Sequence, residues 1–165
     1  MNNFSETVLW ILSLVILVIL LWFTYTIVNI LVTAYRCRKL DHSLSFCFNT
    51  TGKIVYPLAA VIYVVGLIGG IYFMVKGIMS GNNQVFRNAL NVAAFVSVVF
   101  GYLLSSIVMV GRKNLMVGRM MIDYRKLKKV NYTYNNKMSF VYAQQDYSFS
   151  TRFIDKTVLR KAISK

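Results

Sequence analysis

The chain has 165 residues, of which 57% are hydrophobic, with a mean hydropathy of +0.56 and a formal net charge of +14. A water-soluble domain of this size is less apolar, so the composition excludes that class and indicates a membrane protein. Residues 112–165 carry 13 basic residues against 3 acidic ones. Such an excess is typical of nucleic-acid binding, of anionic lipid binding or of cytoplasmic orientation, and beside membrane spans we expect the last.

The first predicted element is a transmembrane helix over residues 7–35. This stretch contains no charged residue, and about 20 apolar residues are enough to cross the hydrocarbon core. A signal peptide is the competing interpretation, but residues 1–6 carry no positive charge and no small-residue cleavage site follows. We therefore expect a spanning helix that tilts or extends past the cytoplasmic interface.

Residues 36–53 follow with four basic residues and one acidic residue, Asp41. Their apolar side chains would give the segment one hydrophobic side: Leu40, Leu44, Phe46 and Phe48. This pattern predicts an amphipathic segment at the membrane interface rather than a free loop.

The chain has two cysteines, Cys37 and Cys47, with His42 between them. Their spacing matches no zinc pattern, and a structural zinc site needs four ligands. We expect reduced thiols and neither a metal nor another cofactor.

Two further spans are predicted, over residues 54–75, with Pro57 in the first turn, and over residues 88–110. Both carry small residues on one helical face at spacings of four or seven. These are Ala59, Gly66, Gly70 and Gly77 in the second span, and Ala89, Ala93, Ser97, Gly101 and Ser105 in the third. Small residues let helix backbones approach closely, which predicts a tight hairpin of these two spans. A pore is the alternative, but no charged residue or histidine lies within the spans to mark one.

The basic residues also predict the orientation. Residues 36–53 and 112–165 together hold 17 Lys and Arg, whereas the opposite side has only Lys76 and Arg87. By the positive-inside rule we expect a multi-pass protein of the cell membrane with its N-terminus outside and its C-terminus in the cytoplasm.

Beyond Arg112 the hydrophobic pattern alternates, which predicts strands. A bent strand or tight hairpin is expected around Gly118, and a short helical or turn excursion at residues 123–129. Further strands are predicted over residues 130–134, 138–142 and 147–151, with turns at Asn135–Asn136 and at residues 144–146. A helix over residues 156–164, capped by Asp155, closes the chain.

The predicted fold is therefore three transmembrane α-helices (residues 1–111) followed by a small cytoplasmic α+β domain (residues 112–165). That domain is an antiparallel sheet of four strands plus a C-terminal helix.

Part of this domain resembles the small bacterial membrane proteins that carry a C-terminal pleckstrin-homology-like domain. The residues that carry the resemblance are Gly118, Met120, Ile122, Asp123, Tyr124, Leu127 and Val130, with the closing helix. A complete barrel of that family has seven strands. The resemblance therefore implies an open sheet here, covered by the closing helix, the membrane surface or a partner chain.

The basic residues nearest the third span predict contact with an anionic inner leaflet, to which each juxtamembrane Lys or Arg contributes about 1 kcal/mol. They are Arg112, Lys113, Arg119, Arg125, Lys126, Lys128 and Lys129. The alternative is that they enforce topology and stay in water. Alternating aromatic residues, Tyr124 and Tyr134 among them, would suit a nucleic-acid platform, but in an amphipathic sheet we expect them to form the core and expect no nucleic-acid partner.

The sequence contains no paired carboxylates, no nucleophile with a base and no nucleotide-binding glycine loop, so we expect no enzymatic activity. The favoured function is an accessory or regulatory subunit that docks on a larger membrane protein such as a transporter, or that protects against a membrane-active peptide. The alternative is a small channel or transporter built by homo-oligomerisation.

Overall fold

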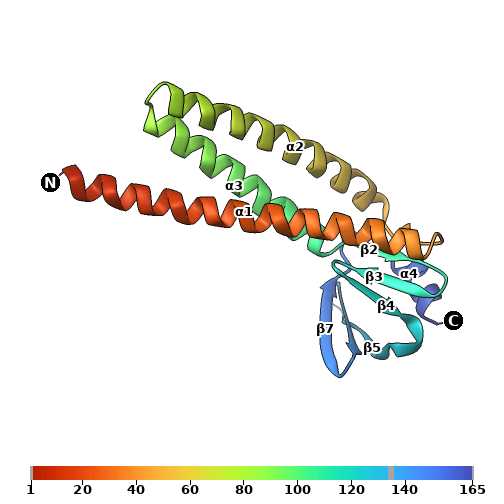
Figure 1. The fold of residues 1–165 in the computed structure, drawn as a ribbon. Coiled ribbons are helices and arrows are strands. Elements are labelled where there is room, and N and C mark those ends of the chain that lie inside the picture. Colours follow the sequence, from red (N-terminus) through yellow and green to blue (C-terminus); the bar gives the residue numbers. More distant parts are fainter. Residues whose placement is uncertain (1, 134–135, 165) are drawn as a thin grey trace. The chain divides into compact units, whose positions relative to one another are not determined.

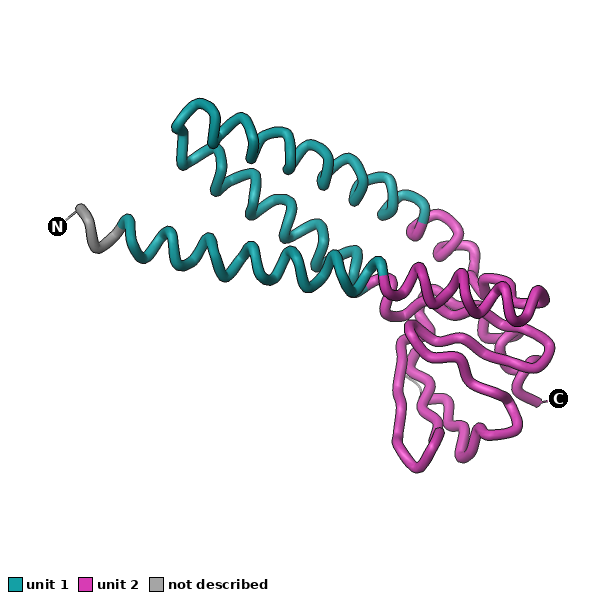
Figure 2. The backbone as a smooth tube through the Cα atoms, viewed as in Figure 1, with its two compact units in different colours: residues 1–28, 57–102 teal, residues 29–56, 103–165 magenta. Residues whose placement is uncertain are grey.

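A computed structural model describes residues 2–133 and 136–164 of the chain. The chain divides into two compact units, coloured separately in Figure 2. The first unit comprises Met1–Val28 and Pro57–Tyr102, and the second comprises Asn29–Tyr56 and Leu103–Lys165. The unit that holds the sheets therefore extends beyond residues 112–165 and also includes the connection between the first two spans.

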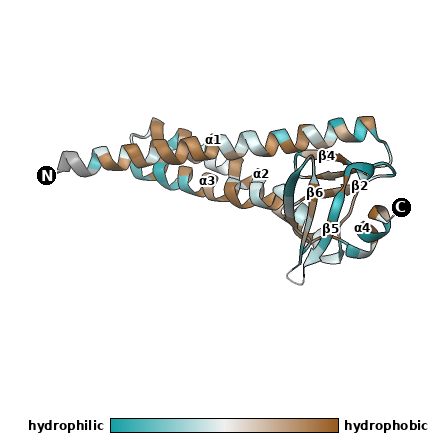
Figure 3. Cartoon of the chain, turned by 90° about the horizontal axis from the view of Figure 1, so that it is seen from below, coloured by the Kyte–Doolittle hydropathy of each residue, from teal (hydrophilic) through white to brown (hydrophobic). Residues whose placement is uncertain are grey.

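Three helices are long and apolar enough to cross a membrane (Figure 1). They are α1 (Asn2–Leu40), α2 (Thr50–Met79) and α3 (Asn83–Ser105). Large apolar side chains point outward on them, and Leu14, Trp22 and Val65 are each more than 60% exposed. Apolar colouring runs along all three helices in Figure 3. Such side chains gain nothing by leaving lipid for one another, so this arrangement suits hydrocarbon. The three predicted helices are confirmed as long and apolar enough to cross a membrane.

The second helix begins earlier than predicted, so Pro57 lies inside α2 rather than in its first turn. The cap is Asn49, whose Oδ1 accepts a hydrogen bond of 2.7 Å from the backbone N–H of Gly52. Polar and basic residues make up the added turn, which is why the apolar run alone placed the start too late. Because proline has no N–H, it cannot donate the helical hydrogen bond to the carbonyl of Lys53.

The third helix ends earlier than predicted, at Ser105, because residues 108–110 form a strand rather than the last turn of the span. All of Ile107, Val108, Met109 and Val110 are buried. A strand buried on both faces reads as a continuous apolar run without alternation. The sequence pattern therefore could not separate this strand from the helix before it.

Two antiparallel sheets and a closing helix follow (Figure 1). The first sheet has the order β1 (Ser45–Phe46), β2 (Val108–Val110), β3 (Asn114–Val117) and β4 (Met120–Asp123). The second has the order β5 (Lys128–Thr133), β6 (Lys137–Tyr142) and β7 (Gln145–Ser150). A 3-10 turn, η1 (Tyr124–Lys126), connects the sheets, and α4 (Lys156–Ile163) ends the chain.

The described residues thus form seven strands, not four. β1 comes from the segment predicted to lie at the membrane interface, and it pairs antiparallel with β2 through Ser45↔Val110 and Phe46↔Met109. Of the apolar residues that predicted an interfacial face, Leu44 is buried against the sheet while Leu40 is 78% exposed. A two-residue strand gives no measurable periodicity, so only its long-range partner reveals it.

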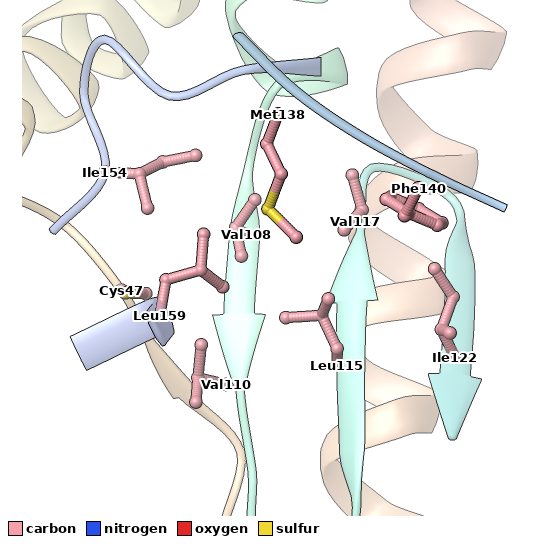
Figure 4. Packing of buried hydrophobic residues seen from close by; sticks show 10 residues of the cluster. All are labelled: Cys47, Val108, Val110, Leu115, Val117, Ile122, Met138, Phe140, Ile154 and Leu159. Carbon is pink, nitrogen blue, oxygen red and sulfur yellow. The ribbon is translucent and has the colours of Figure 1, made fainter. Parts of the chain in front are cut away.

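The core of the second unit lies between the two sheets and α4 (Figure 4). Both sheets and the helix contribute to one buried cluster: Cys47, Val108, Val110, Leu115, Val117, Ile122, Met138, Phe140, Ile154 and Leu159. The opposite face of the first sheet is also covered. There Met109 and Met116 pack with Cys37 of α1 and with Leu44. The first sheet is therefore buried on both faces.

The predicted turn at Gly118 and the predicted cap of the last helix are confirmed. Gly118 joins β3 to β4 with φ +56°, which favours glycine, and the Asp155 carboxylate caps α4 by accepting from the N–H groups of Thr157 and Val158. The turn between β6 and β7 instead centres on Ala143 and Gln144, both at positive φ. Tyr134 and Asn135 lie outside the described residues.

Candidate functional site

Glycines bring α2 and α3 into close contact within the first unit. A Cβ atom on Gly70 would lie 2.8 Å from the Cβ of Ala93, and one on Gly77 would lie 2.7 Å from the backbone nitrogen of Phe86. A Cβ on Gly66 would lie 3.3 Å from Val96. No larger residue fits at Gly70 or Gly77 unless the helices move apart, so these positions set the separation of α2 and α3.

The small residues of α3 pack against two neighbouring helices, α2 and α1. Ala89 and Ala93 are buried, and Ser97 is fully buried with its hydroxyl donating to the carbonyl of Ala93 at 2.8 Å. A Cβ on Gly101 would lie 2.8 Å from the Phe23 ring of α1. Of the other predicted packing positions, Ala59 is half-buried and Ser105 is exposed.

An apolar groove of about 460 Å³ lies beside these contacts, between α2 and α3. Its lining residues are Gly66, Gly69, Gly70, Phe73, Val85, Asn88, Ala89 and Val92. A Cβ on Gly69 would meet nothing within 4 Å, so this glycine is not used to pack the hairpin. Gly69 lies one residue off the face defined by spacings of four and seven, so the pattern of small residues does not predict its role.

The seven basic residues predicted to contact lipid are all exposed, and within the described ranges none of them forms an ion pair. They do not form one patch. The backbone N–H of Arg112 donates to the Ser43 hydroxyl at 2.8 Å, and the carbonyl of Lys113 accepts from the N–H of Tyr124 at 3.2 Å. Arg112, Lys113 and the η1 residues Arg125 and Lys126 therefore share one end of the β3–β4 hairpin.

Arg119 lies at the opposite end of that hairpin. Its neighbour Gly118 approaches the end of α3, since a Cβ there would lie 2.7 Å from the carbonyl oxygen of Ser105. Strands of four residues separate the two ends by about 13 Å. Lys128 and Lys129 begin β5, one residue after η1, and so stay close to Arg125 and Lys126. Closeness in sequence to the third span therefore brings only Arg119 next to the end of α3.

Asp41 accepts the hydrogen bonds that stabilise the end of the β3–β4 hairpin where Arg112 lies. Its carboxylate accepts hydrogen bonds from the hydroxyl and the N–H of Ser43 and from the Asn114 amide. The Ser43 hydroxyl bond is the main reason that the pKa of Asp41 lies below its ordinary value. Asp41 therefore stays ionised beside this basic loop and fixes its backbone.

Both thiols are buried, Cys37 against the outer face of the first sheet and Cys47 in the main core. Burial raises the pKa of the Cys47 thiol to about 11, and its Sγ donates to the carbonyl of Asp155 at 3.3 Å. No cluster of three or more His, Cys, Asp or Glu side chains suited to a metal ion occurs in the part of the chain that the structure describes.

Comparison with known proteins finds no matching family model, no matching curated protein and no matching solved structure.

Proposed function

We propose that this chain is an accessory or regulatory subunit that docks on a larger integral membrane protein through its helical hairpin. The groove between α2 and α3 carries this proposal. Its occupant in the membrane must be apolar along most of its length, because apolar side chains and glycine backbone line nearly all of it. A transmembrane helix of the partner meets this requirement.

Gly69 makes a helix a better occupant than a lipid chain. Gly69 has no side chain, and a Cβ atom placed there would meet no other part of the protein within 4 Å beyond its own helix turn. A second backbone can therefore approach closely and gain dispersion contacts along the groove. Asn88 adds a polar side chain to the lining. Hydrogen bonds between helices in a bilayer are worth about 0.6 to 2 kcal/mol, so Asn88 can orient the partner helix.

Charge favours a different protein over a second copy. The second unit holds 17 Lys and Arg against 4 Asp. Two copies docked side by side would bring two strongly cationic units together, whereas a partner with acidic residues on that side would be attracted. The partner we propose is therefore a larger membrane protein whose segments next to the bilayer are acidic.

The second unit is proposed to be a pleckstrin-homology-like domain on the cytoplasmic side of a bacterial cell membrane. Seven strands in sheets of four and three, followed by a closing helix, support this assignment. The β1–β2 pairing also supports the topology, because it holds the connection after α1 and the segment after α3 on one side of the bilayer. The excess of basic residues there favours the cytoplasmic side.

Site-specific photo-crosslinking in intact membranes tests the docking. The crosslinking amino acid is placed at Val92, which lines the groove, and in a separate variant at Phe95, which is 69% exposed on α3 outside it. We expect an adduct with one larger membrane protein from Val92 and not from Phe95. Mass spectrometry identifies that protein, and a crosslinker in its own transmembrane segment must capture this chain in return.

A groove-filling variant makes the test specific. Gly69→Leu should abolish the adduct without disturbing the hairpin, whereas Val65→Leu, at a position 65% exposed on the same helix, should leave it intact. An adduct of twice the chain mass would show that the groove binds a second copy of this chain and not a different protein. Equal capture from both positions, or no protein adduct at all, would reject docking through this groove.

A further inference from the structure

A polar pocket of about 350 Å³ lies in the second unit, where one end of the second sheet meets α4. Its lining residues are Tyr132, Thr133, Lys137, Thr151, Lys156 and Arg160. The register explains why they meet. Thr133 pairs with Lys137, and Lys137 pairs with Ser150 just before Thr151, so all three strands end here. The first two turns of α4 close the other side.

Three positive charges converge on this pocket, and none of the described residues that line it is acidic. Lys156 and Arg160 are four residues apart and so share one face of α4, while Lys137 comes from the first residue of β6. None of these three cations has an ion-pair partner within residues 2–133 and 136–164. Like charges held together repel one another, and an anion in the pocket would relieve that repulsion.

Hydrogen-bond donors in the pocket remain available. The Arg160 guanidinium lies over the Tyr132 ring, 4.7 Å from its centroid, so stacking positions it while its N–H groups bond to no described residue. The Lys156 ammonium uses one of its three donors on Asn136 Oδ1 at 2.5 Å.

We propose that this pocket binds a phosphoryl group, carried either by a soluble phosphorylated molecule or by a phosphorylated lipid headgroup. A phosphomonoester carries about −1.5 to −2 charge near neutral pH and three acceptor oxygens. Three cations more than balance that charge, and a guanidinium binds phosphate through two parallel hydrogen bonds. The volume lies near the lower end of small-ligand sites, about 300 to 1,000 Å³. This site does not depend on the docking groove, which lies in the other unit.

Calorimetric titration of inorganic phosphate into the full chain, held in phosphatidylcholine nanodiscs at constant ionic strength, tests the site. We expect saturable binding to one site per chain. Arg160→Gln should weaken it at least tenfold, whereas Lys161→Gln, which removes the same charge from the neighbouring α4 position outside the pocket, should leave it unchanged. If Arg160→Gln disturbs folding, Lys137→Gln provides the same test from an exposed position on β6.

Phosphatidic acid in the nanodiscs distinguishes the two sources of the phosphoryl group. If lipid supplies it, phosphatidic acid should compete and weaken phosphate binding at least tenfold in wild type but not further in Arg160→Gln. If a soluble molecule supplies it, the affinity should stay the same in both lipid compositions. Absence of saturable binding, or equal weakening by Lys161→Gln and Arg160→Gln, would reject the pocket as a specific site.

Discussion

A Cβ atom on Gly70 would lie 2.8 Å from the Cβ of Ala93, closer than two such atoms approach in folded proteins. Gly69, one residue earlier, would meet nothing within 4 Å. These two adjacent glycines of α2 therefore differ in what surrounds them. Gly70 determines how closely the hairpin packs, and Gly69 leaves the groove open.

Alanine at each glycine separates these roles. Both substitutions gain the same helix propensity, about 1 kcal/mol, but overpacking at position 70 costs about 1 to 3 kcal/mol. Gly70→Ala should therefore be less stable than Gly69→Ala by about that amount. Thermal unfolding of the purified variants in one detergent measures the difference. Equal stabilities would show that the hairpin can absorb a methyl group at Gly70.

The β3–β4 turn should tolerate alanine poorly. Gly118 combines φ +56° with a Cβ position 2.7 Å from the Ser105 carbonyl oxygen, whereas Gly81 has φ +65° in open space. Gly81→Ala should lose roughly 1 kcal/mol through backbone strain. Gly118→Ala should lose about 1 to 3 kcal/mol more because the strands must also shift. Denaturant titrations of both variants check the order, and the opposite order would contradict the close approach of residues 105 and 118.

The native cysteines should not react with thiol reagents from either side of the membrane. Cys37 is 4% exposed and Cys47 is 3% exposed, so neither reports topology. Cysteines introduced at exposed positions of the same chain can report its topology. We expect an impermeant maleimide to label Asn82→Cys in intact cells and His42→Cys only after permeabilisation. Labelling of His42→Cys from outside would reverse the proposed orientation, and labelling of the unmodified chain would contradict the burial of its thiols.

Stability should fall at alkaline pH because of Cys47. Burial raises its folded-state pKa from 9.0 to about 11, so between these values the folded state holds a proton that the unfolded state has lost. The thiol's contribution is therefore fully present below pH 9.0 and is lost as pH rises through about 11. Melting temperatures from pH 8 to 11 should decline more steeply in wild type than in Cys47→Ala. Parallel curves would show that the thiol is not the group responsible.

Features that local chemistry dictates could be predicted from the amino-acid sequence alone. A bilayer requires a long apolar helix whatever the rest of the chain does, so all three long apolar helices could be predicted. The α4 cap at Asp155 and the turn at Gly118 followed in the same way, from a side chain that accepts backbone N–H groups and from a backbone angle that favours glycine. Each of these depends on a few consecutive residues.

Features that depend on partners far away in the sequence became visible in the folded chain. β1 exists because Ser45 and Phe46 pair with β2, some 60 residues later. β2 appeared to continue the third helix because both of its faces are buried, one by the core and one by α1 and Leu44. A pattern of apolar residues predicts which residues are buried, but it does not predict which element covers them. The groove at Gly69 and the cation pocket at Arg160 were equally hidden from the sequence, since each is the space left where separate elements meet.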